Sequence, residues 1–146
     1  MSDVLHKQSV SAIPLNPEGK ILLQLRDDRP KYNPNCWTTF GGAVEVGETP
    51  DEAMRRELLE EIELELPMVL WKVQEVLVER EGQKIAWENY IYVGFIDRAA
   101  SEIKLNEGQA LGYFALEDLS KLQIGFDFEP LFRDFFAALA AGKLPL

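Results

Sequence analysis

Three closely spaced glutamates in the first half of the chain have a spacing that suits metal binding. On an α-helix, Glu57, Glu60 and Glu61 fall within an arc of about 100°. Like charges three or four residues apart destabilise a helix by roughly 0.2 to 0.5 kcal/mol per pair, which a bound divalent cation would offset. Ligand sets made only of carboxylate oxygens favour Mg²⁺ or Mn²⁺, with Ca²⁺ as a competitor, and Mg²⁺ is commonly shared with substrate phosphates. The cluster therefore indicates cleavage or transfer at a diphosphate, and the alternative is a solvated acidic helix face.

The helix that must carry these glutamates is well marked. Thr49-Pro50-Asp51-Glu52 has the form of a helix start, with Thr49 as the N-cap, proline at the first helical position and a glutamate that closes a capping box. The helix is predicted to run to about Ile62. Together with Met54 and Leu58, Ile62 forms an apolar stripe separate from the glutamates. One side of the helix can therefore be buried while the carboxylates stay available.

The other patterned segments predict an α/β domain. Strands are predicted at residues 8–13, 20–26, 37–40, 69–78, 85–96 and 112–115, with turns at residues 16–19 and 81–82. The strand at 37–40 is expected to lead into a turn at Gly41-Gly42. A second helix is predicted near the end of the chain, with Asp127 as its cap, an apolar stripe at residues 131–139 and Gly142 beyond its end. Two helices and about six strands in mixed order indicate helices packed against a mixed sheet.

Charge narrows the classes of function. The chain has 25 Asp or Glu and 15 Lys or Arg, which gives a net charge of −10. This surplus argues against binding a nucleic-acid polymer or an anionic membrane through a basic face, because such binding needs Lys and Arg to neutralise phosphates. A ligand that carries phosphate would need a bound cation or a few placed arginines.

Length and cysteine content predict one cytoplasmic domain. A chain of 146 residues with 47% hydrophobic residues can bury the core of a single domain, predicted over residues 1–146. Cys36 has no second cysteine to pair with, and Asp3, His6 and Lys7 interrupt the apolar run that a signal peptide needs. The sequence leaves the oligomeric state open, with a homodimer as one alternative.

The glutamates belong to a longer pattern with six fixed positions: Gly42, Glu48, Arg56, Glu57, Glu60 and Glu61. This pattern, over residues 42–64, resembles the Nudix box, the signature of the Nudix hydrolase family. The order of predicted elements resembles the family's α/β/α sandwich, in which a mixed β-sheet lies between helices. Glu63 stands where the family usually has Gly, and Phe40 stands where many members have Pro. We therefore expect an altered helix exit at Glu63 with an intact site, and Phe40 leaves the exact turn at the glycines open.

The resemblance implies a metal-dependent hydrolase in which water attacks phosphorus in a nucleoside diphosphate derivative, such as a nucleotide sugar or a nucleoside triphosphate. The ion would be Mg²⁺, with Mn²⁺ as a substitute. Its implied ligands are the carboxylates of Glu57, Glu60 and Glu61 and the main-chain carbonyl of Gly41 or Gly42. The metal would lower the pKa of the attacking water and neutralise the diphosphate.

Three further residues have implied roles with open alternatives. Arg56 would orient a glutamate, since it lies one helical turn from Glu52 and from Glu60, or would form an ordinary surface ion pair. Glu48 would be either a metal ligand or a structural residue of the loop before the helix. Glu107, in the loop at residues 106–109, would be a further ligand or the general base, or else an exposed loop residue without a function.

The loop at residues 26–35 carries the cations that are best placed to meet a substrate phosphate: Arg26, Arg29 and Lys31. Pairing with the aspartates at positions 27 and 28 is the alternative. Two aromatic residues, Tyr32 and Trp37, would stack on a nucleobase or line the core, and the core is favoured for Trp37.

Two rival functions stand beside a hydrolase. One is a Nudix-like module that binds a ligand or regulates without turnover, which the loss of ligand glutamates would favour. None of these glutamates is lost. The other is an acidic interaction domain in which the box is a coincidence. Within the enzyme class, the box indicates a diphosphate and leaves open what is attached to it.

Overall fold

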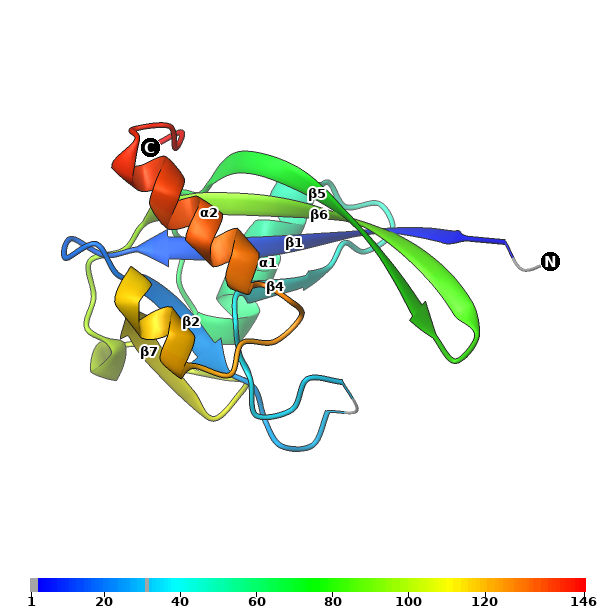
Figure 1. The fold of residues 1–146 in the computed structure, drawn as a ribbon, viewed down its shortest axis with the longest axis horizontal. Helices are drawn as coiled ribbons and strands as arrows, with labels where there is room; N and C mark the ends of the chain where they lie inside the picture. The colour runs from blue at the N-terminus through cyan, green and yellow to red at the C-terminus, as the bar shows by residue number, and fades with distance from the viewer. Residues whose placement is uncertain (1–2, 31) are drawn as a thin grey trace.

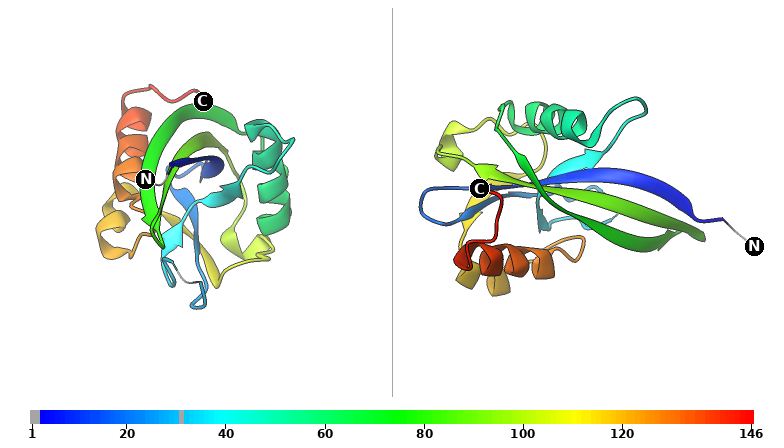
Figure 2. Two further views of the ribbon diagram at one scale, coloured as in Figure 1. Left: turned by 90° about the vertical axis from the view of Figure 1, so that its right-hand side faces the viewer. Right: turned by 90° about the horizontal axis from the view of Figure 1, so that it is seen from above.

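A single mixed sheet lies between two α-helices. The computed structural model describes residues 3–30 and 32–146. Within them the strands are β1 (Leu5–Leu15), β2 (Ile21–Leu25), β3 (Trp37–Thr38), β4 (Phe40–Ala43), β5 (Val69–Arg80), β6 (Gln83–Phe95) and β7 (Ala110–Phe114). The helices are α1 (Pro50–Ile62) and α2 (Glu129–Ala140), with short 3₁₀ turns at Ala100–Glu102 and Leu116–Lys121. Helix α1 covers one face of the sheet and α2 covers the other (Figure 2), which confirms the predicted α/β/α sandwich.

Strand β1 is the centre of the sheet. It pairs in parallel with β6 along its whole length, from Leu5 opposite Ile85 to Leu15 opposite Phe95. On its other side it pairs antiparallel with β4 and, at Leu15, with β2, which extends the sheet to β3 and β7. The β5–β6 hairpin and the start of β1 project beyond the helices (Figure 1). Part of the sheet therefore has no helix over it.

The alternation of side chains along β1 shows which residues lie on the uncovered part of the sheet. Val10 and Ala12 are buried in the core beneath α1, and Ile13 and Leu15 are buried in the core that includes α2. Successive side chains of a strand point to opposite faces, so the serine at position 11 shares the α2 face with Ile13. Apolar residues on that face give way to polar ones where α2 no longer covers the sheet.

The strand predicted at residues 37–40 is broken, and the predicted glycine turn is wrong. Thr39 separates β3 from β4, and Gly41 and Gly42 lie inside β4, paired with Ser11 and Val10 of β1. Gly41 has a φ of +152°, and a Cβ added to it would lie 1.9 Å from the Val10 carbonyl oxygen. The glycine is needed for this close approach between strands rather than for a turn.

The start of α1 agrees with the sequence, and its end corrects it. The Thr49 hydroxyl accepts a hydrogen bond from the Glu52 backbone N–H at 3.2 Å, and the Glu52 carboxylate accepts one from the Thr49 N–H at 3.0 Å, which confirms the capping box. Glu63 adopts the left-handed conformation (φ 56°, ψ 33°), and its N–H donates to the Leu59 carbonyl. The expected altered helix exit is therefore wrong, because Glu63 itself takes the conformation that glycine usually supplies.

The start of α2 also differs from its prediction. The N-cap is Phe128, without a side-chain cap, and Asp127 precedes it in a left-handed conformation with a φ of 54°. Asp127 is therefore not the cap. Gly142 follows the end of the helix with a φ of +67°, as the sequence predicted. Among the described residues, no helix has the length and apolar character needed to cross a membrane.

Candidate active site

Arg56 of α1 is the centre of an ion-pair network. Its Nε and Nη2 donate to the two oxygens of Glu48 at 2.7 and 2.9 Å. Its Nη1 donates to Glu57 at 3.0 Å and to Glu60 at 3.2 Å, and its Nη2 also donates to the Ala43 carbonyl at 3.1 Å. One guanidinium thus joins the loop before α1 to two glutamates of the predicted metal set.

Glu48 is fully engaged in this network. Its Oε1 accepts a hydrogen bond from the Glu45 backbone N–H as well as from Arg56. The Arg56 hydrogen bond, followed by that of the Glu45 N–H, lowers the pKa of Glu48 to about 2. These contacts favour the structural role of Glu48 in the loop, and its role as a metal ligand stays a prediction.

Glu61 lies in the opposite environment. Its side chain is buried, with 2% of the residue exposed. Its Oε1 accepts a hydrogen bond from Gln24 Nε2 at 2.9 Å, and its Oε2 accepts one from the Gly41 N–H at 3.0 Å. Burial raises the pKa of Glu61 to about 8, and the charges of Glu57 and Glu107 also raise it. Glu61 is thus a buried carboxyl held by two neutral donors.

Glu57 lies between these two environments. Burial raises the pKa of its carboxyl, although the hydrogen bond from Arg56 opposes this shift. A Cβ added to Gly42 would lie 2.5 Å from Glu57 Oε1, so a larger residue there would displace the carboxylate from its place against β4. The absent side chain also leaves the main chain at Gly42 open to a ligand.

Glu107 is brought to the cluster by its loop. The Asn106 backbone N–H donates to the Glu61 carbonyl at 2.9 Å, and its side chain donates to the Glu60 carbonyl at 2.9 Å and to the Glu63 carboxylate at 3.0 Å. These bonds fasten the loop to the end of α1. The Glu107 charge raises the pKa of both Glu57 and Glu61, which indicates that the three carboxylates lie near one another.

The donor set fits a hard divalent cation. In the part of the chain that the structure describes, no three acidic, imidazole or thiol groups are already placed around a common metal position. The charge of Glu107 nevertheless raises the pKa of Glu57 and of Glu61, the charge of Glu57 also raises that of Glu61, and an ion among these carboxylates would offset the repulsion. Glu60 is exposed, and its carboxylate contacts Arg56. All of these candidate ligands offer oxygen atoms, as Mg²⁺ and Mn²⁺ prefer.

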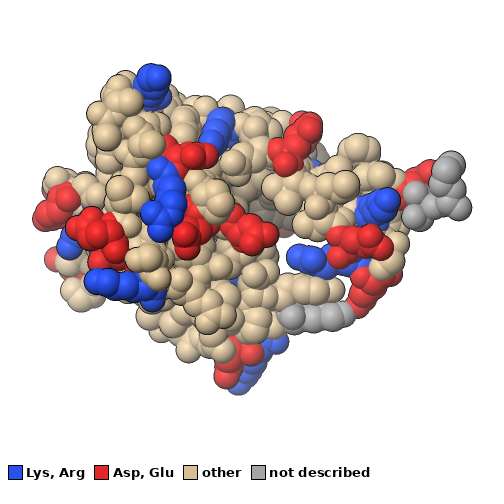
Figure 3. All heavy atoms as spheres, in the orientation of Figure 1, with Lys and Arg blue, Asp and Glu red and all other residues tan. Residues whose placement is uncertain are grey.

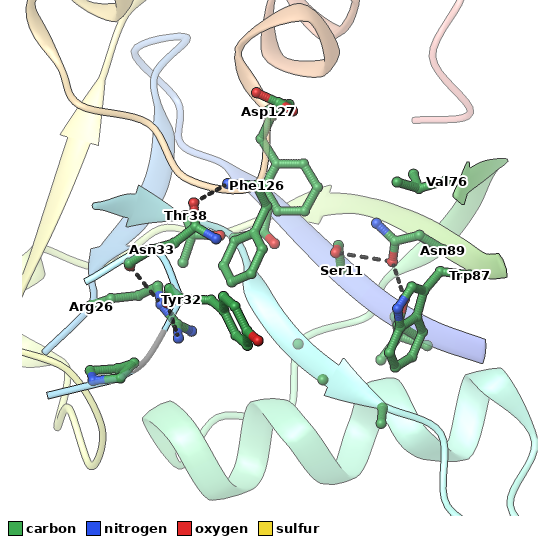
Figure 4. Close-up of a pocket in the computed structure, with 18 of the residues that line it drawn as sticks. Ser11, Arg26, Tyr32, Asn33, Thr38, Val76, Trp87, Asn89, Phe126 and Asp127 are labelled. Carbon is green, nitrogen blue, oxygen red and sulfur yellow. Dashed lines mark hydrogen bonds between the residues drawn. The ribbon is translucent and has the colours of Figure 1, made fainter. Parts of the chain in front are cut away.

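A cavity of about 800 Å³ opens beside the cluster. Glu61, Glu107, Gly41 and Gly42 line one part of it, and it extends over the uncovered face of the sheet toward Trp87. Figure 4 shows aromatic side chains around it, and Figure 3 shows acidic and basic side chains interspersed on the surface of the molecule. The cavity is large enough for a nucleotide.

The predicted cationic loop contributes unevenly to this cavity. Arg26 lines it, but its Nε and Nη2 donate to the carbonyls of Asn33 and Tyr32, and its guanidinium lies 4.8 Å from the centre of the Phe126 ring. Arg29 is exposed and is not among the residues that line the cavity. Lys31 lies outside the described residues. The substrate-binding roles of Arg26 and Arg29 stay predictions.

Of the two aromatic residues predicted near the site, one lines the cavity and contacts an arginine, and the other lies in the core. Tyr32 lines the cavity, while Trp37 packs edge-on against Phe114 at 4.7 Å in the α2-side core, as predicted. Arg80, from the end of β5, lies 4.2 Å from the Tyr32 ring centre and also lines the cavity. This role of Arg80 could not be predicted from the sequence, because its place depends on how the β5–β6 hairpin bends over the sheet.

Other residues of the site were also missed from the sequence. Ser9, Ser11 and Asn89 lie on the α2 face of the sheet, whereas Gln24 lies on the α1 face with Leu22 and donates to Glu61. Polar residues at alternate strand positions next to apolar neighbours were the available signal, because a buried face that turns polar marks a place where something other than core must pack.

The fold and the box together agree with comparisons to known proteins. The NUDIX domain family model matches residues 5–135. The chain belongs to the Nudix family. This confirms the prediction of a Nudix-type pyrophosphohydrolase at the level of the family, and the box residues listed above lie within the matched region.

Similar Nudix proteins span nearly the whole chain. An RNA pyrophosphohydrolase of Gluconacetobacter diazotrophicus is 26% identical over 92% of this chain and 93% of its own length. The MutT protein of Methanosarcina mazei has a TM-score of 0.71 at 23% identity, covering 97% of this chain and 98% of its own. The NUDIX domain of Shewanella oneidensis NrtR, solved with ADP ribose, has a TM-score of 0.73 at 16% identity, covering 95% and 90%. These two structures support the fold alone.

Proposed function

We propose that this Nudix protein is a divalent-metal-dependent pyrophosphohydrolase that cleaves the diphosphate linkage of a nucleoside diphosphate derivative, a nucleotide sugar or a nucleoside triphosphate. One observation carries the proposal: the buried Glu61 carboxyl, with Glu57 and Glu107 close to it, opens onto a cavity of about 800 Å³. Acidic groups gathered at one end of a nucleotide-sized cavity suit a metal-bridged diphosphate.

Each residue of the cluster has a distinct part in this proposal. Mg²⁺, or Mn²⁺ in its place, would be held by Glu57, Glu60 and Glu61, with Gly42 supplying a main-chain oxygen, and would activate water and neutralise the diphosphate. Arg56 keeps Glu57 and Glu60 oriented through its hydrogen bonds.

Glu107 and two arginines have further roles in the proposal. Glu107, on a loop fastened to α1, would take a proton from the attacking water or add a ligand. Arg26 and Arg29 would meet the phosphates. The Asn106 bonds to the end of α1 keep the Glu107 loop beside Glu61, so the acid stays within the cluster.

Known relatives and charge bear on the substrate class. One relative is named as an RNA pyrophosphohydrolase, and one similar structure contains ADP ribose. The net charge of −10 favours a small substrate over an RNA chain, because a polymer would bring many uncompensated phosphates to an acidic surface. We further propose that residues 1–146 act as one domain in the cytoplasm, and a homodimer stays a prediction.

A substrate panel tests the proposal. The purified chain is given nucleoside triphosphates, nucleotide sugars and a 5′-triphosphorylated RNA, each with Mg²⁺, with Mn²⁺ and with a chelator, and the phosphate products are identified. Metal-dependent release from a small substrate supports the proposal, and preferred release from the RNA overturns the substrate class. Tight binding of a nucleotide without any turnover would instead establish the non-catalytic module.

A further inference from the structure

The floor of the cavity is a polar and uncharged patch on the uncovered face of the sheet. Ser9 and Ser11 of β1 lie beside Asn89 of β6, and both serine hydroxyls donate to Asn89 Oδ1, at 3.0 and 3.2 Å. Ser11 and Asn89 are buried, with 5% and 6% of their surfaces exposed. Figure 4 shows the amide at the cavity wall with its oxygen turned to the serine. We call these three residues the amide floor.

The two serines fix the orientation of the amide. With Oδ1 accepting from both hydroxyls, each serine hydrogen has an acceptor, and the reversed amide would take that acceptor away from both. The amide nitrogen is then on the other side. Among the residues that the structure describes, none accepts a hydrogen bond from Nδ2, and no fully enclosed side-chain nitrogen or oxygen lacks a partner. Nδ2 therefore faces the cavity as a donor in need of an acceptor.

The surroundings of the amide floor suit a flat heterocycle. Trp87 precedes it on β6, and Val76 and Val78 line the cavity from β5. Gln74, opposite Asn89 on β5, is a second uncharged polar side chain at this end. A ring that is apolar on its faces and polar at its edge matches walls of this composition.

The amide floor and the acidic cluster line the same cavity, close enough for one nucleotide to reach both. Ser11 is directly opposite Gly41 in the β1–β4 pair, and the Gly41 N–H donates to Glu61. A diphosphate at Glu61 would thus be one strand away from the floor, and the rest of a nucleotide would extend over it. The cluster and the floor are two ends of one cavity.

We propose that Asn89, held by Ser9 and Ser11, selects the nucleobase by donating a hydrogen bond to a ring carbonyl. This inference rests on the proposed function. Adenine pairs with an asparagine through both an amide N–H and an amide oxygen, whereas the corresponding edge of guanine carries only acceptors. Because the Asn89 oxygen is occupied, the Asn89 amide offers only N–H donors to a ligand. Guanine and uracil present a carbonyl acceptor at the base-edge position where adenine and cytosine carry an amino group, so this amide favours guanine and uracil.

The test compares base preference in matched variants. Asn89→Asp places an acceptor oxygen where Nδ2 stood, and the double variant Ser9→Ala, Ser11→Ala releases the amide so that it can turn. We expect the guanosine-to-adenosine ratio of kcat/KM, measured with GTP and ATP, to fall by about 10-fold or more in Asn89→Asp and toward unity in the serine variant. Gln83→Glu is the control, because it adds the same charge to β6 at a residue that does not line the cavity.

Binding without turnover separates this inference from the proposed function. Calorimetry with GMP, UMP, AMP and CMP, in the absence of metal, reads the base preference directly. Tighter binding of GMP and UMP that is lost in Asn89→Asp supports the amide floor even where no substrate of the panel is hydrolysed, in which case the proposed function fails alone. An unchanged base ratio in Asn89→Asp, or the same change in Gln83→Glu, overturns the inference.

Discussion

Two carboxylates near opposite ends of α1, Glu48 just before the helix and Glu61 in its last turn, have opposite surroundings. Glu48 accepts hydrogen bonds from Nε and Nη2 of Arg56, which lower the pKa of Glu48 to about 2. Glu61 is buried with neutral donors only, and burial raises its pKa to about 8. The first acid has its cation within the chain. The second has only neutral donors among the described residues, so in the proposed function its charge would be offset by a bound cation.

Glu57 shows that the two regions are joined. Its carboxylate accepts from Arg56 on one side and repels Glu61 on the other. A divalent ion near Glu61 would therefore draw Glu57 away from the arginine or share it. If the proposed metal binds, the ion-pair network would hold Glu57 and Glu60 at one edge of its site and leave the charge of Glu61 for the metal to offset.

The largest expected effect comes from removing the charge of the buried acid. Glu61→Gln keeps the shape of the side chain but takes away the carboxylate that needs the ion, so we expect kcat to fall by about 100-fold or more with a full complement of Mg²⁺. Steady-state kinetics on the best substrate of the panel measures this. Wild-type kcat in the variant would remove Glu61 from the active site.

Glu65→Gln is the matched control for that variant. Glu65 is an exposed glutamate just beyond α1 that pairs with Arg55. The same loss of charge there should leave kcat within about 2-fold of the wild type, since surface ion pairs contribute little. A thermal melt of both variants, read by circular dichroism, shows that the fold persists.

A smaller loss of activity is expected from changing Arg56. Arg56→Lys keeps the charge, but a lysine cannot span both oxygens of Glu48 and also reach Glu57. We expect a fall in kcat/KM of about 10-fold and a loss of roughly 1 to 2 kcal/mol in the free energy of unfolding, measured in urea. Arg55→Lys is the control, as Arg55 makes one exposed contact to Glu65. Equal effects of the two substitutions would show that Arg56 has no special role.

Several contacts of α1 were predictable from the sequence, because they depend on local spacing. The capping box and the four-residue step from Arg56 to Glu60 are contacts within one helix, where geometry follows from the period. The bond from Arg56 to Glu48 was missed, although both residues belong to the box. It depends on how the loop before the helix folds back.

The surroundings of Glu61 were not predictable in the same way. An arc of three glutamates on a helix wheel does not tell which of them points into the protein. Gln24 and the Gly41 N–H come from strands far along the chain, and only the packing of α1 on the sheet brings them to Glu61. The same holds for the Ser9–Asn89 contact, which depends on the parallel register of β1 and β6.

The pH dependence of stability gives a third test of the difference between Glu48 and Glu61. In the metal-free protein, Glu61 has a pKa of about 8 against an ordinary value of 4.5. The native state thus keeps a proton that the unfolded chain releases, and stability falls as pH rises from about 4.5 toward 8. Urea unfolding with a chelator, at intervals between pH 5 and 8, measures this. Glu61→Gln should flatten the slope, and a slope identical to that of the wild type would contradict the assignment.

The smallest effect concerns a third carboxylate, at the end of α1. Glu63 holds a left-handed conformation that favours glycine, and its carboxylate contacts Asn106 and Lys104, both near the Glu107 loop. Glu63→Gly relieves the backbone but loses these contacts, whereas Glu63→Ala loses the contacts and keeps the strain. We therefore expect the glycine variant to melt roughly 2 to 5 °C above the alanine variant. If the contacts also steady the Glu107 loop, both variants will lower kcat by a similar small factor, since neither restores them. Equal melting temperatures would show that the left-handed backbone at this position carries no strain.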